Sequence, residues 1–356
     1  MTKQNSKKRI LITKPYLETG GVHSFVSNII SFFTLNVFVF KRGRNPKIKF
    51  KFLSLFHNFF TPFRYLFSII FYQPNYIIVN TSLSKGNLIR DGIIIFISKI
   101  YQKKVLLIIH GFQENALKYK YLLKFGYFKA DAIIVLAQEF ADLIKKAGYK
   151  RKIVVQYNPV SIDIIDDLSN REVKPEEPLN NILFMSRVLK EKGTLTAIKA
   201  FKSAQKKYPK INMKIAGVGD FLKEAKKFVE ENKIDNIEFL GFVKGQKKIE
   251  LLKKSDVFLF PTEYKEGLPI NILEAMAAKQ VIITRPVGGL IDLFKDCSFG
   301  SLLYSVDPED FKKAIVEINE NKEKFNSIRE FNSKYAINNF HPRIIVNHIE
   351  KVLKEL

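Results

Sequence analysis

The sequence predicts an α/β protein with two domains, each built on a parallel sheet that helices cover on both faces. The chain has 356 residues, which suggests two domains at roughly 100–200 residues each. Short apolar runs alternate with helical stretches along the chain, and this alternation is typical of a parallel sheet. Hydrophobic residues make up 46% and charged residues 26% of the chain, a composition typical of a folded protein.

Two series of short apolar runs are the candidate strands. In the first half we expect strands at Arg9–Thr13, Asn36–Phe40, Tyr76–Asn80, Lys104–Ile109, Asp131–Leu136 and Ile153–Gln156. In the second half we expect them at Ile182–Met185, Asn212–Ala216, Ile237–Leu240, Val257–Phe260 and Val281–Thr284, with Phe299–Tyr304 as a further candidate.

A segment rich in proline and charge separates the two series. Asn158–Asn181 contains three prolines, so we interpret it as the interdomain linker. The predicted domains are residues 1–165 and residues 166–340. The stretch Asp307–Leu356 is expected to be helical, with Pro342 in the first turn of a last helix over 341–356 that packs back on the first domain.

The charge of the chain is uneven. The formal net charge is +24, with 24 basic and 6 acidic residues in positions 1–150 but 35 and 29 in positions 151–356. A basic first half can attract nucleic acid, an anionic membrane surface or a polyanionic substrate.

Cysteine content and hydropathy favour a cytoplasmic protein. Cys297 is the single cysteine, so no disulfide can form within the chain, which fits a reducing compartment. The apolar run that follows the basic N-terminus is too short for a signal peptide. Polar residues interrupt the longest uncharged segment, Tyr65–Ser84, so we expect no membrane-spanning helix and a protein that is soluble or attached to a membrane from one side.

The sharpest motif is E-G-L-P-I-N-I-L-E-A-M-A-A, from Glu266 to Ala278. Pro269 suits a helix start, where the backbone N–H groups from Ile270 onward can meet an anion. Glu266 would precede this start and Glu274 would lie about two turns in. The alternative is that Glu266 only complements the helix dipole and that Glu274 lies on a solvated face.

The second motif is S-R-V-L-K-E-K-G, from Ser186 to Gly193, directly after a candidate strand. Arg187 and Lys192 would lie near the carboxyl end of that strand, where ligands bind in open α/β sheets. A guanidinium can bind two phosphate oxygens and a lysine adds a point charge. The alternative is ordinary surface charge.

Two further signals lie in the first half. Gly20 and Gly21 follow the first candidate strand, and paired glycines let backbone N–H groups approach an oxyanion. His110 ends another strand and precedes a glycine, although a lone histidine is more often structural. Neither this loop nor Gly217–Gly219 has the G-x-G-x-x-G spacing, which argues against an NAD enzyme.

Other catalytic signatures are absent. The sequence has no H-E-x-x-H, C-x-x-C, G-x-x-x-x-G-K-[ST] or G-x-S-x-G. Metal, P-loop and serine-hydrolase chemistries therefore lack support.

In their order, these motifs resemble glycosyltransferase family 4, a retaining family with the GT-B fold. That fold has two Rossmann-like domains facing each other across a cleft. The resemblance is strong over residues 180–290, where R-x-x-x-x-K is followed by E-x-x-x-x-x-x-x-E. In the first half it rests on the Gly-Gly loop, His110 and N-P-V-S-I-D at Asn158–Asp163.

The resemblance implies roles for the residues of these motifs. Glu266 and His110 would contact the transferred sugar, as the catalytic residues. The donor, a nucleotide-diphosphate sugar, would be bound by Gly20, Gly21, Arg187, Lys192, Gly267, Leu268, Ile270, Glu274, Phe242 and Val243. The last two would border the base and Glu274 the ribose. No metal and no other cofactor are expected, because cationic side chains and a helix start can stabilise the leaving diphosphate.

The resemblance also places the acceptor, a glycan or a lipid-linked molecule, on the first domain. Residues 41–51 carry six basic side chains and no acid, and an aromatic-rich stretch follows. We therefore expect a peripheral enzyme on the cytoplasmic membrane face that binds an anionic membrane surface. Its function would lie in polysaccharide, lipopolysaccharide or glycolipid assembly.

Three other functions fit the sequence less well. A sugar-nucleotide epimerase of the same fold would need acid and base side chains in the cleft. A glycosidase would need two carboxylates about 5–5.5 Å apart, which the spacing of Glu266 and Glu274 on one helix would not give. A basic nucleic-acid-binding protein is the third alternative. This chain contains no recognised nucleic-acid-binding motif, so no nucleic acid is expected as a partner.

Overall fold

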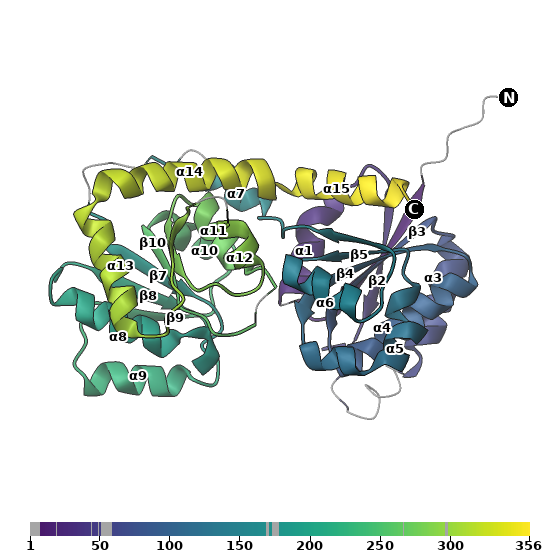
Figure 1. Cartoon of the computed structure of the whole chain (residues 1–356), viewed down its shortest axis with the longest axis horizontal. Helices are drawn as coiled ribbons and strands as arrows, with labels where there is room; N and C mark the ends of the chain where they lie inside the picture. The colour runs from purple at the N-terminus through teal and green to yellow at the C-terminus, as the bar shows by residue number, and fades with distance from the viewer. Residues whose placement is uncertain are drawn as a thin grey trace. The chain divides into compact units, whose positions relative to one another are not determined.

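The computed structural model describes residues 8–18, 20–43, 45–48, 50, 59–168, 171–172, 178–265, 267–295 and 298–356. The chain divides into two compact units. The first unit comprises Met1–Pro159 together with Pro342–Leu356, and the second comprises Val160–His341. Each unit is a parallel sheet with helices on both of its faces (Figure 1).

The first unit holds a six-stranded parallel sheet in the order β2-β1-β3-β4-β5-β6. Its strands are β1 (Arg9–Pro15), β2 (Asn36–Arg42), β3 (Tyr76–Leu83), β4 (Lys104–Phe112), β5 (Ala132–Val135) and β6 (Lys152–Val155). Its helices are α1 (Gly21–Ile29), α3 (Thr61–Tyr72), α4 (Lys85–Ile100), α5 (Lys120–Phe125), α6 (Gln138–Lys146) and α15 (Pro342–Lys354), with 3₁₀ turns η1 (Ile30–Phe32), η2 (Glu114–Lys118) and η3 (Tyr127–Lys129).

The second unit holds a six-stranded parallel sheet in the order β12-β11-β10-β7-β8-β9. Its strands are β7 (Asn181–Met185), β8 (Asn212–Ala216), β9 (Ile237–Gly241), β10 (Val257–Phe260), β11 (Val281–Thr284) and β12 (Gly300–Leu302). Its helices are α7 (Ile162–Leu168), η4 (Lys190–Lys192), α8 (Thr194–Gln205), α9 (Leu222–Glu231), α10 (Gln246–Lys253), α11 (Ile270–Ala277), α12 (Gly289–Phe294), α13 (Pro308–Glu320) and α14 (Lys322–Phe340).

The central strands are apolar without interruption because both faces of a parallel sheet are buried. In the first unit, alternate residues enter two separate cores. Ile10 and Ile12 of β1 pack with α1 and with Ile345 and Ile349 of α15, whereas Leu11 packs on the other face among residues of α3, α4 and α6. The last helix of the chain therefore belongs to the core of the first unit.

Each sheet has one point at which the strand order reverses. In the first unit it lies between β1 and β3, and in the second between β7 and β10. The connections on either side of such a point leave in opposite directions, so the loops at the carboxyl ends of these strands part and leave room for a ligand.

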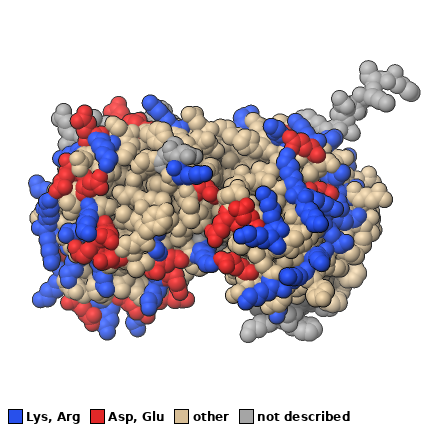
Figure 2. Space-filling model, in the orientation of Figure 1, with Lys and Arg blue, Asp and Glu red and all other residues tan. Residues whose placement is uncertain are grey.

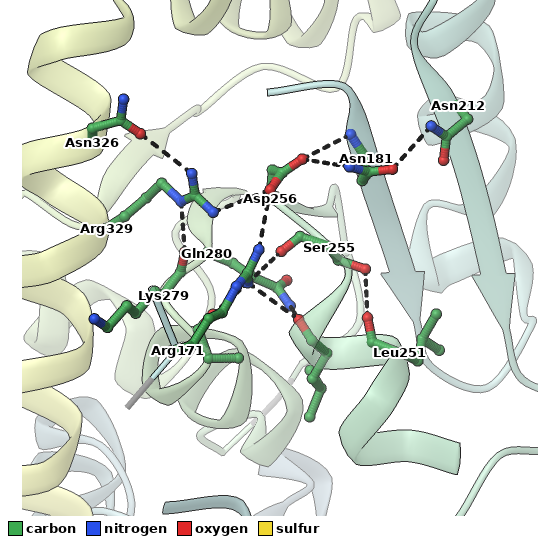
Figure 3. Close-up of polar contacts among 12 residues, drawn as sticks. Arg171, Asn181, Asn212, Leu251, Ser255, Asp256, Lys279, Gln280, Asn326 and Arg329 are labelled. Atoms are coloured by element: carbon green, nitrogen blue, oxygen red, sulfur yellow. Dashed lines mark hydrogen bonds and ion pairs between the residues drawn. The ribbon is translucent and has the colours of Figure 1, made fainter. Parts of the chain in front are cut away.

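A buried network of hydrogen bonds and ion pairs around Asp256 links the elements at the amino edge of the second sheet (Figure 3). Asp256, just before β10, accepts hydrogen bonds from Arg171 and Arg329 at 3.1 Å each through Oδ1. Its Oδ2 accepts from the backbone and side-chain amides of Asn181 on β7 at 3.1 and 2.7 Å. These bonds join two strands, α14 and the chain segment that enters the unit.

The predicted strands and the helical C-terminal stretch are confirmed, including a strand at Gly300–Leu302 and a helix that begins at Pro342. Two details differ. The expected linker contains helix α7, because Ile164, Ile165 and Leu168 are buried. Strand β4 does not end at His110 but continues to Phe112, after a shift in its register with β3.

Candidate functional site

The second unit carries a cavity of about 220 Å³ at the carboxyl edge of its sheet, beside the point where the strand order reverses. It is formed where β7, β8 and β9 end and where α10 and α11 approach them. Its lining consists of Met185, Ser186, Arg187, Ala216, Gly217, Val218, Phe242, Val243, Lys248, Asn271 and Glu274. This mixture of apolar wall and few charged groups is typical of a small-molecule site.

Among the residues that the structure describes, Glu274 supplies the only carboxylate of that lining. The side chain is 4% exposed, so the predicted alternative of a solvated face is wrong. Its Oε1 accepts a hydrogen bond from Nζ of Lys248 on α10 at 2.6 Å, and its Oε2 is buried without a hydrogen-bond partner among the described residues. Burying a carboxylate oxygen without a hydrogen-bond donor costs free energy. Oε2 of Glu274 is therefore suited to accept a hydrogen bond from a hydroxyl group of a ligand.

The loop after β7 brings two cations to this edge. Lys192 is 5% exposed, which excludes ordinary surface charge for this residue. Its Nζ lies 4.2 Å from the ring centroid of Tyr264, and Cζ of Arg187 lies 5.7 Å from the same centroid. Burial and then the neighbouring Arg187 lower the pKa of Lys192 to about 7. Such a lysine gains its proton readily when an anion arrives.

The close fit between the loops after β7 and β10 fixes these cations. Gly193 has φ +77°, and a Cβ there would lie 2.2 Å from the carbonyl oxygen of Pro261. The backbone N–H groups of Glu263 and Tyr264 both donate to the carbonyl of Glu191, at 2.8 and 2.9 Å. Glycine is therefore required at 193 so that the loop bearing Lys192 can lie against the loop bearing Tyr264.

The G-V-G sequence at 217–219 has a structural role that the sequence did not reveal. A Cβ on Gly217 would lie 1.7 Å from the carbonyl oxygen of Ser186, and one on Gly219 would lie 2.3 Å from that of Val188. The two glycines thus let the loop after β8 pack on the loop after β7. This contact presents Val218, which is 49% exposed, to the cavity.

Helix α11 begins at Ile270 with Pro269 as its N-cap, so Glu274 lies one turn into the helix and not the expected two. Asn271 donates from Nδ2 to the carbonyl of Met185, which ties the helix start to the end of β7. The carbonyl of Gly267 accepts from the N–H of Gly289 at 2.6 Å. Glu266 lies outside the described residues.

The structure brings some of the predicted donor residues into one cavity. Arg187, Phe242, Val243 and Glu274 line it together. Lys192 at the end of η4, Gly267 and Leu268 in the loop after β10, and Ile270 at the start of α11 lie nearby and do not line it. Sequence reasoning missed the cavity residues Lys248, Asn271 and Val218. No motif pointed to Lys248, since 26 residues separate it from Glu274.

The predicted residues of the first unit lie on β4 and at the start of α1. Gly20 is the N-cap of α1 with φ 94°, and Gly21 is the first residue of the helix. A Cβ on either glycine would meet nothing within 4 Å, so the backbone conformation, not crowding, favours glycine at position 20. His110 packs edge-on against Phe25 of α1, with 4.5 Å between ring centroids.

His110 is held neutral. Its Nε2 lies 3.0 Å from Oδ1 of Asn80, whose Nδ2 already donates to the carbonyl of Thr13 at 3.0 Å. Oδ1 must therefore accept, so that Nε2 carries the ring proton. Burial and then the nearby Arg42 lower the pKa of His110 to about 3. At neutral pH this ring can donate or accept a hydrogen bond but brings no positive charge.

The described residues show neither a metal-binding cluster nor a membrane-spanning helix. Within the part of the chain that the structure describes, no three or more His, Cys, Asp or Glu side chains are grouped so that they could hold a metal ion. The helices of the same part include none with the length and hydropathy that a membrane span needs.

Comparison with known proteins adds a family match. Residues 166–335, which contain all of the second-unit site, match the family described as "Glycosyl transferases group 1". An uncharacterized glycosyltransferase of Methanocaldococcus jannaschii, MJ1069, is 26% identical over 274 residues, which are 72% of this chain and 69% of that protein. The alpha-monoglucosyldiacylglycerol synthase of Streptococcus pneumoniae is 25% identical over 231 residues, or 61% of this chain and 51% of that protein.

Among solved structures, Anabaena Alr3699/HepE in complex with UDP and glucose is similar to this chain, with a TM-score of 0.75 and 18% sequence identity. The match covers 98% of this chain and 100% of that chain. This likeness confirms the predicted GT-B fold with two Rossmann-like domains. The family match and the relatives together support a glycosyltransferase.

Proposed function

We propose that the protein transfers a hexosyl group, with retention of configuration and without a metal ion, from a nucleoside diphosphate sugar to a lipid-linked or surface-glycan acceptor at a membrane. The observation that carries this proposal is the cavity at the carboxyl edge of the second sheet. At the strand reversal of a Rossmann-like sheet, it combines the buried carboxylate of Glu274, the cations Arg187 and Lys248 and an apolar wall, and the glycosyl transferases group 1 match covers the same residues.

The chemistry of the cavity fits the parts of such a donor. Oε2 of Glu274 is available to accept a ribose hydroxyl, and Lys248 holds the carboxylate in place through Oε1. Phe242, which is 62% exposed, and Val243 would border the base. Arg187 and Lys192 would bind the diphosphate, together with backbone N–H groups of Gly267, Leu268 and Ile270.

The reaction needs stabilisation of the leaving group more than it needs a nucleophile. The acceptor hydroxyl oxygen bonds to the anomeric carbon while the bond from that carbon to the phosphate oxygen breaks. The hydroxyl proton passes to the leaving phosphate on the same face, so the configuration is retained. Arg187 and Lys192 oppose the negative charge that develops on the diphosphate, and preorganised donors of this kind act most strongly in the transition state.

Helix α3 supports a membrane location. Phe63, Phe67, Ile70 and Phe71 are between 53% and 68% exposed, and their spacing puts them on one face of the helix. Tyr65 and Ile69 hold the opposite face in the core. An exposed row of aromatic side chains is suited to the interface of a bilayer.

Charge supports the same location. Lys and Arg side chains gather in a band on the visible face of the first unit (Figure 2), and residues 1–150 hold 24 basic against 6 acidic residues. Basic residues close to an anionic leaflet contribute about 1 kcal/mol each. Of the predicted basic segment 41–51, Lys41 and Lys47 are exposed, Arg42 is buried, and Arg44, Lys49 and Lys51 lie outside the described residues. The pneumococcal relative, an alpha-monoglucosyldiacylglycerol synthase by name, supports a lipid acceptor.

The catalytic part of the proposal is tested by incubating the full chain with nucleoside diphosphate sugars and lipid acceptors, with and without EDTA. We expect transfer that EDTA leaves unchanged, and a product whose anomeric configuration, read by NMR, equals that of the donor. An inverted product would refute retention. Activity that EDTA abolishes and Mg²⁺ or Mn²⁺ restores would refute metal independence.

The membrane part is tested by vesicle sedimentation. Binding should require an anionic lipid such as phosphatidylglycerol and weaken with salt, and Phe63→Ser with Phe67→Ser should reduce it. The matched control is Phe331→Ser, because Phe331 is also exposed but lies on the second unit. Equal binding to phosphatidylcholine and phosphatidylglycerol vesicles, or an equal loss in the control, would contradict the membrane location.

A further inference from the structure

The first unit carries its own cavity, of about 410 Å³, at the carboxyl edge of its sheet where the strand order reverses. Its walls come from the loops after β1, β2 and β3 and from the starts of α1 and α4. The lining residues are Pro15, Tyr16, Leu17, Val22, Arg42, Gly43, Thr81, Ser82, Asn87 and Arg90. By position this is the place in the sheet where a ligand is expected, yet none of the predicted donor residues lines it.

The polar wall of this cavity has an excess of positive charge. The carboxylate of Asp91 is fully buried and pairs with Arg42 at 3.2 Å and with Arg90 at 2.8 Å. Arg90 also donates to the second carboxylate oxygen at 2.9 Å, and the hydroxyl of Thr81 donates to the same oxygen at 2.5 Å. Two guanidinium groups thus share one carboxylate, and no acidic residue lines the cavity among those that the structure describes.

Arg42 is the more unusual of the two. It is 4% exposed, and its Nε has no hydrogen-bond partner among the described residues, while Nη2 donates to the carbonyl of Asn80. A buried guanidinium that exceeds its local countercharge is costly unless a further anion offsets it. Arg90 is one-third exposed, at 33%, so a ligand in the cavity can reach it.

The cavity is also joined to the aromatic helix α3. Arg64 donates from Nη2 to the hydroxyl of Tyr16 at 2.6 Å, and Tyr16 lines the cavity. Arg64 lies between Phe63 and Phe67 in sequence, so α3 contacts the cavity wall on one side and presents its aromatic row on another. A head group in the cavity would therefore lie beside the surface proposed to meet the lipid.

We propose that this cavity is an anion subsite that binds a phosphate group of the acceptor, with Arg42 and Arg90 as its cationic wall. The acceptor is then an anionic amphiphile, such as a lipid phosphate, and not a neutral sugar or diacylglycerol. That the ligand is the acceptor rests on the proposed function; that the cavity binds phosphate does not. A phosphate monoester can come from a lipid head group or from a soluble phosphate, and the two are separated experimentally.

The chain contains no tryptophan, so Leu17→Trp would place a single tryptophan, which can be excited selectively over the tyrosines, at the cavity, where Leu17 is 55% exposed. The full-length variant is titrated with dihexanoyl phosphatidic acid below its critical micelle concentration, with glycerol 3-phosphate and with dihexanoylglycerol. We expect saturable fluorescence changes with the two phosphates and none with the neutral lipid. Tighter binding of dihexanoyl phosphatidic acid than of glycerol 3-phosphate would show that the cavity prefers an amphiphilic phosphate. Equal binding of the two would show that the ligand is a soluble phosphate.

Two variants in this background locate the site. Arg90→Gln should weaken phosphate binding by about ten-fold or more, because a charge-assisted contact to phosphate is lost. Lys145→Gln, on the exposed side of α6, removes the same charge and should change nothing. Equal affinities of the two variants, or no saturable signal with any phosphate, would overturn the proposal.

A second pair avoids both the reporter and Arg90, which also supports Asp91. Leu17→Glu puts a carboxylate at the mouth of the cavity, and Leu17→Gln is its neutral match. By calorimetry, Leu17→Glu should bind dihexanoyl phosphatidic acid at least several-fold more weakly than Leu17→Gln, because like charges repel. Indistinguishable affinities would contradict the anion subsite. Since these are binding measurements, they stand even if no sugar transfer is found.

Discussion

Both edges of the second sheet carry a buried carboxylate, but the two carboxylates differ in how many of their oxygens have hydrogen-bond partners within the chain. At the amino edge, both oxygens of Asp256 are bonded, to two arginines and to Asn181. At the carboxyl edge, Glu274 has one oxygen bonded to Lys248 and the other without a partner among the described residues. A charge network whose groups are matched within the chain stabilises the fold, whereas an incomplete one is suited to bind a ligand.

The arginines of the amino edge extend this contrast. Nη1 of Arg171 donates to the carbonyls of Ser255 and Ala278 at 2.7 Å each, and Nε of Arg329 donates to the carbonyl of Lys279 at 2.8 Å (Figure 3). These bonds satisfy carbonyls at helix ends that would otherwise be orphaned. Lys192, at the other edge, instead lies over an aromatic ring, with a lowered pKa.

The largest effect is expected from Asp256→Ala. Removing one partner of a buried ion pair leaves the other charge uncompensated and costs about 3–5 kcal/mol. Urea unfolding of the full chain should therefore show a large loss of stability for Asp256→Ala and a clearly smaller one for Glu274→Ala. A greater loss of stability for Glu274→Ala would contradict the assignment of the amino edge to stability and of the carboxyl edge to ligand binding.

The next effect is on catalysis. Glu274→Ala and Arg187→Ala should both severely reduce transfer while the fold stays intact. For Arg187→Ala the loss should be about 10²–10³-fold, the usual cost of removing one preorganised donor to a developing negative charge. Glu330→Ala is the control, since Glu330 is a partly exposed carboxylate that pairs with Lys279 at the amino edge. Folded Glu274→Ala and Arg187→Ala variants that keep near-full activity would show that this cavity is not the donor site.

The contrast between the edges also explains how far the sequence could predict this molecule. The strands and the C-terminal helices were predictable because each is marked by a pattern of apolar residues within its own short stretch of sequence. Motifs likewise predicted Arg187 and Glu274 at the carboxyl edge of the second sheet, where both side chains lie. The partners of Glu274 and Asp256 were not predictable, because Lys248 and Arg329 come from α10 and α14, and no local pattern records which side chains meet across a sheet. The glycines at 217 and 219 were recognised only as lacking a dinucleotide motif, since their contacts are with the loop after β7.

A pH effect of intermediate size is expected from Lys192. With a pKa of about 7 in the free protein, this amine is mostly neutral at higher pH and must take up a proton to pair with a diphosphate. The dissociation constant of the nucleotide should therefore rise with pH, by up to ten-fold per unit between about pH 8 and pH 9.5. Calorimetry in buffers of different ionisation enthalpy measures the uptake. Lys192→Met should abolish it, and uptake that persists in this variant would assign the proton to another group.

The smallest effect is expected from Phe242→Ala. An exposed ring that borders a base contributes about 1–3 kcal/mol when it stacks, so the nucleotide should bind at least several-fold more weakly, with little change in stability. Phe331→Ala serves as an exposed control on the same unit. Unchanged affinity in Phe242→Ala would place the base elsewhere.

The most direct test of the account is whether the carboxyl edge of the second sheet binds a nucleoside diphosphate. Thermal shifts of the full chain with UDP, GDP, dTDP and ADP are compared for the wild type, Lys192→Met and Lys279→Met, which removes a buried lysine from the opposite edge. Because a ligand that binds the native state raises its stability, we predict a saturable rise with at least one of the four. That rise should be kept in Lys279→Met and largely lost in Lys192→Met. No rise with any of them, or an equal rise in both variants, would contradict the central claim.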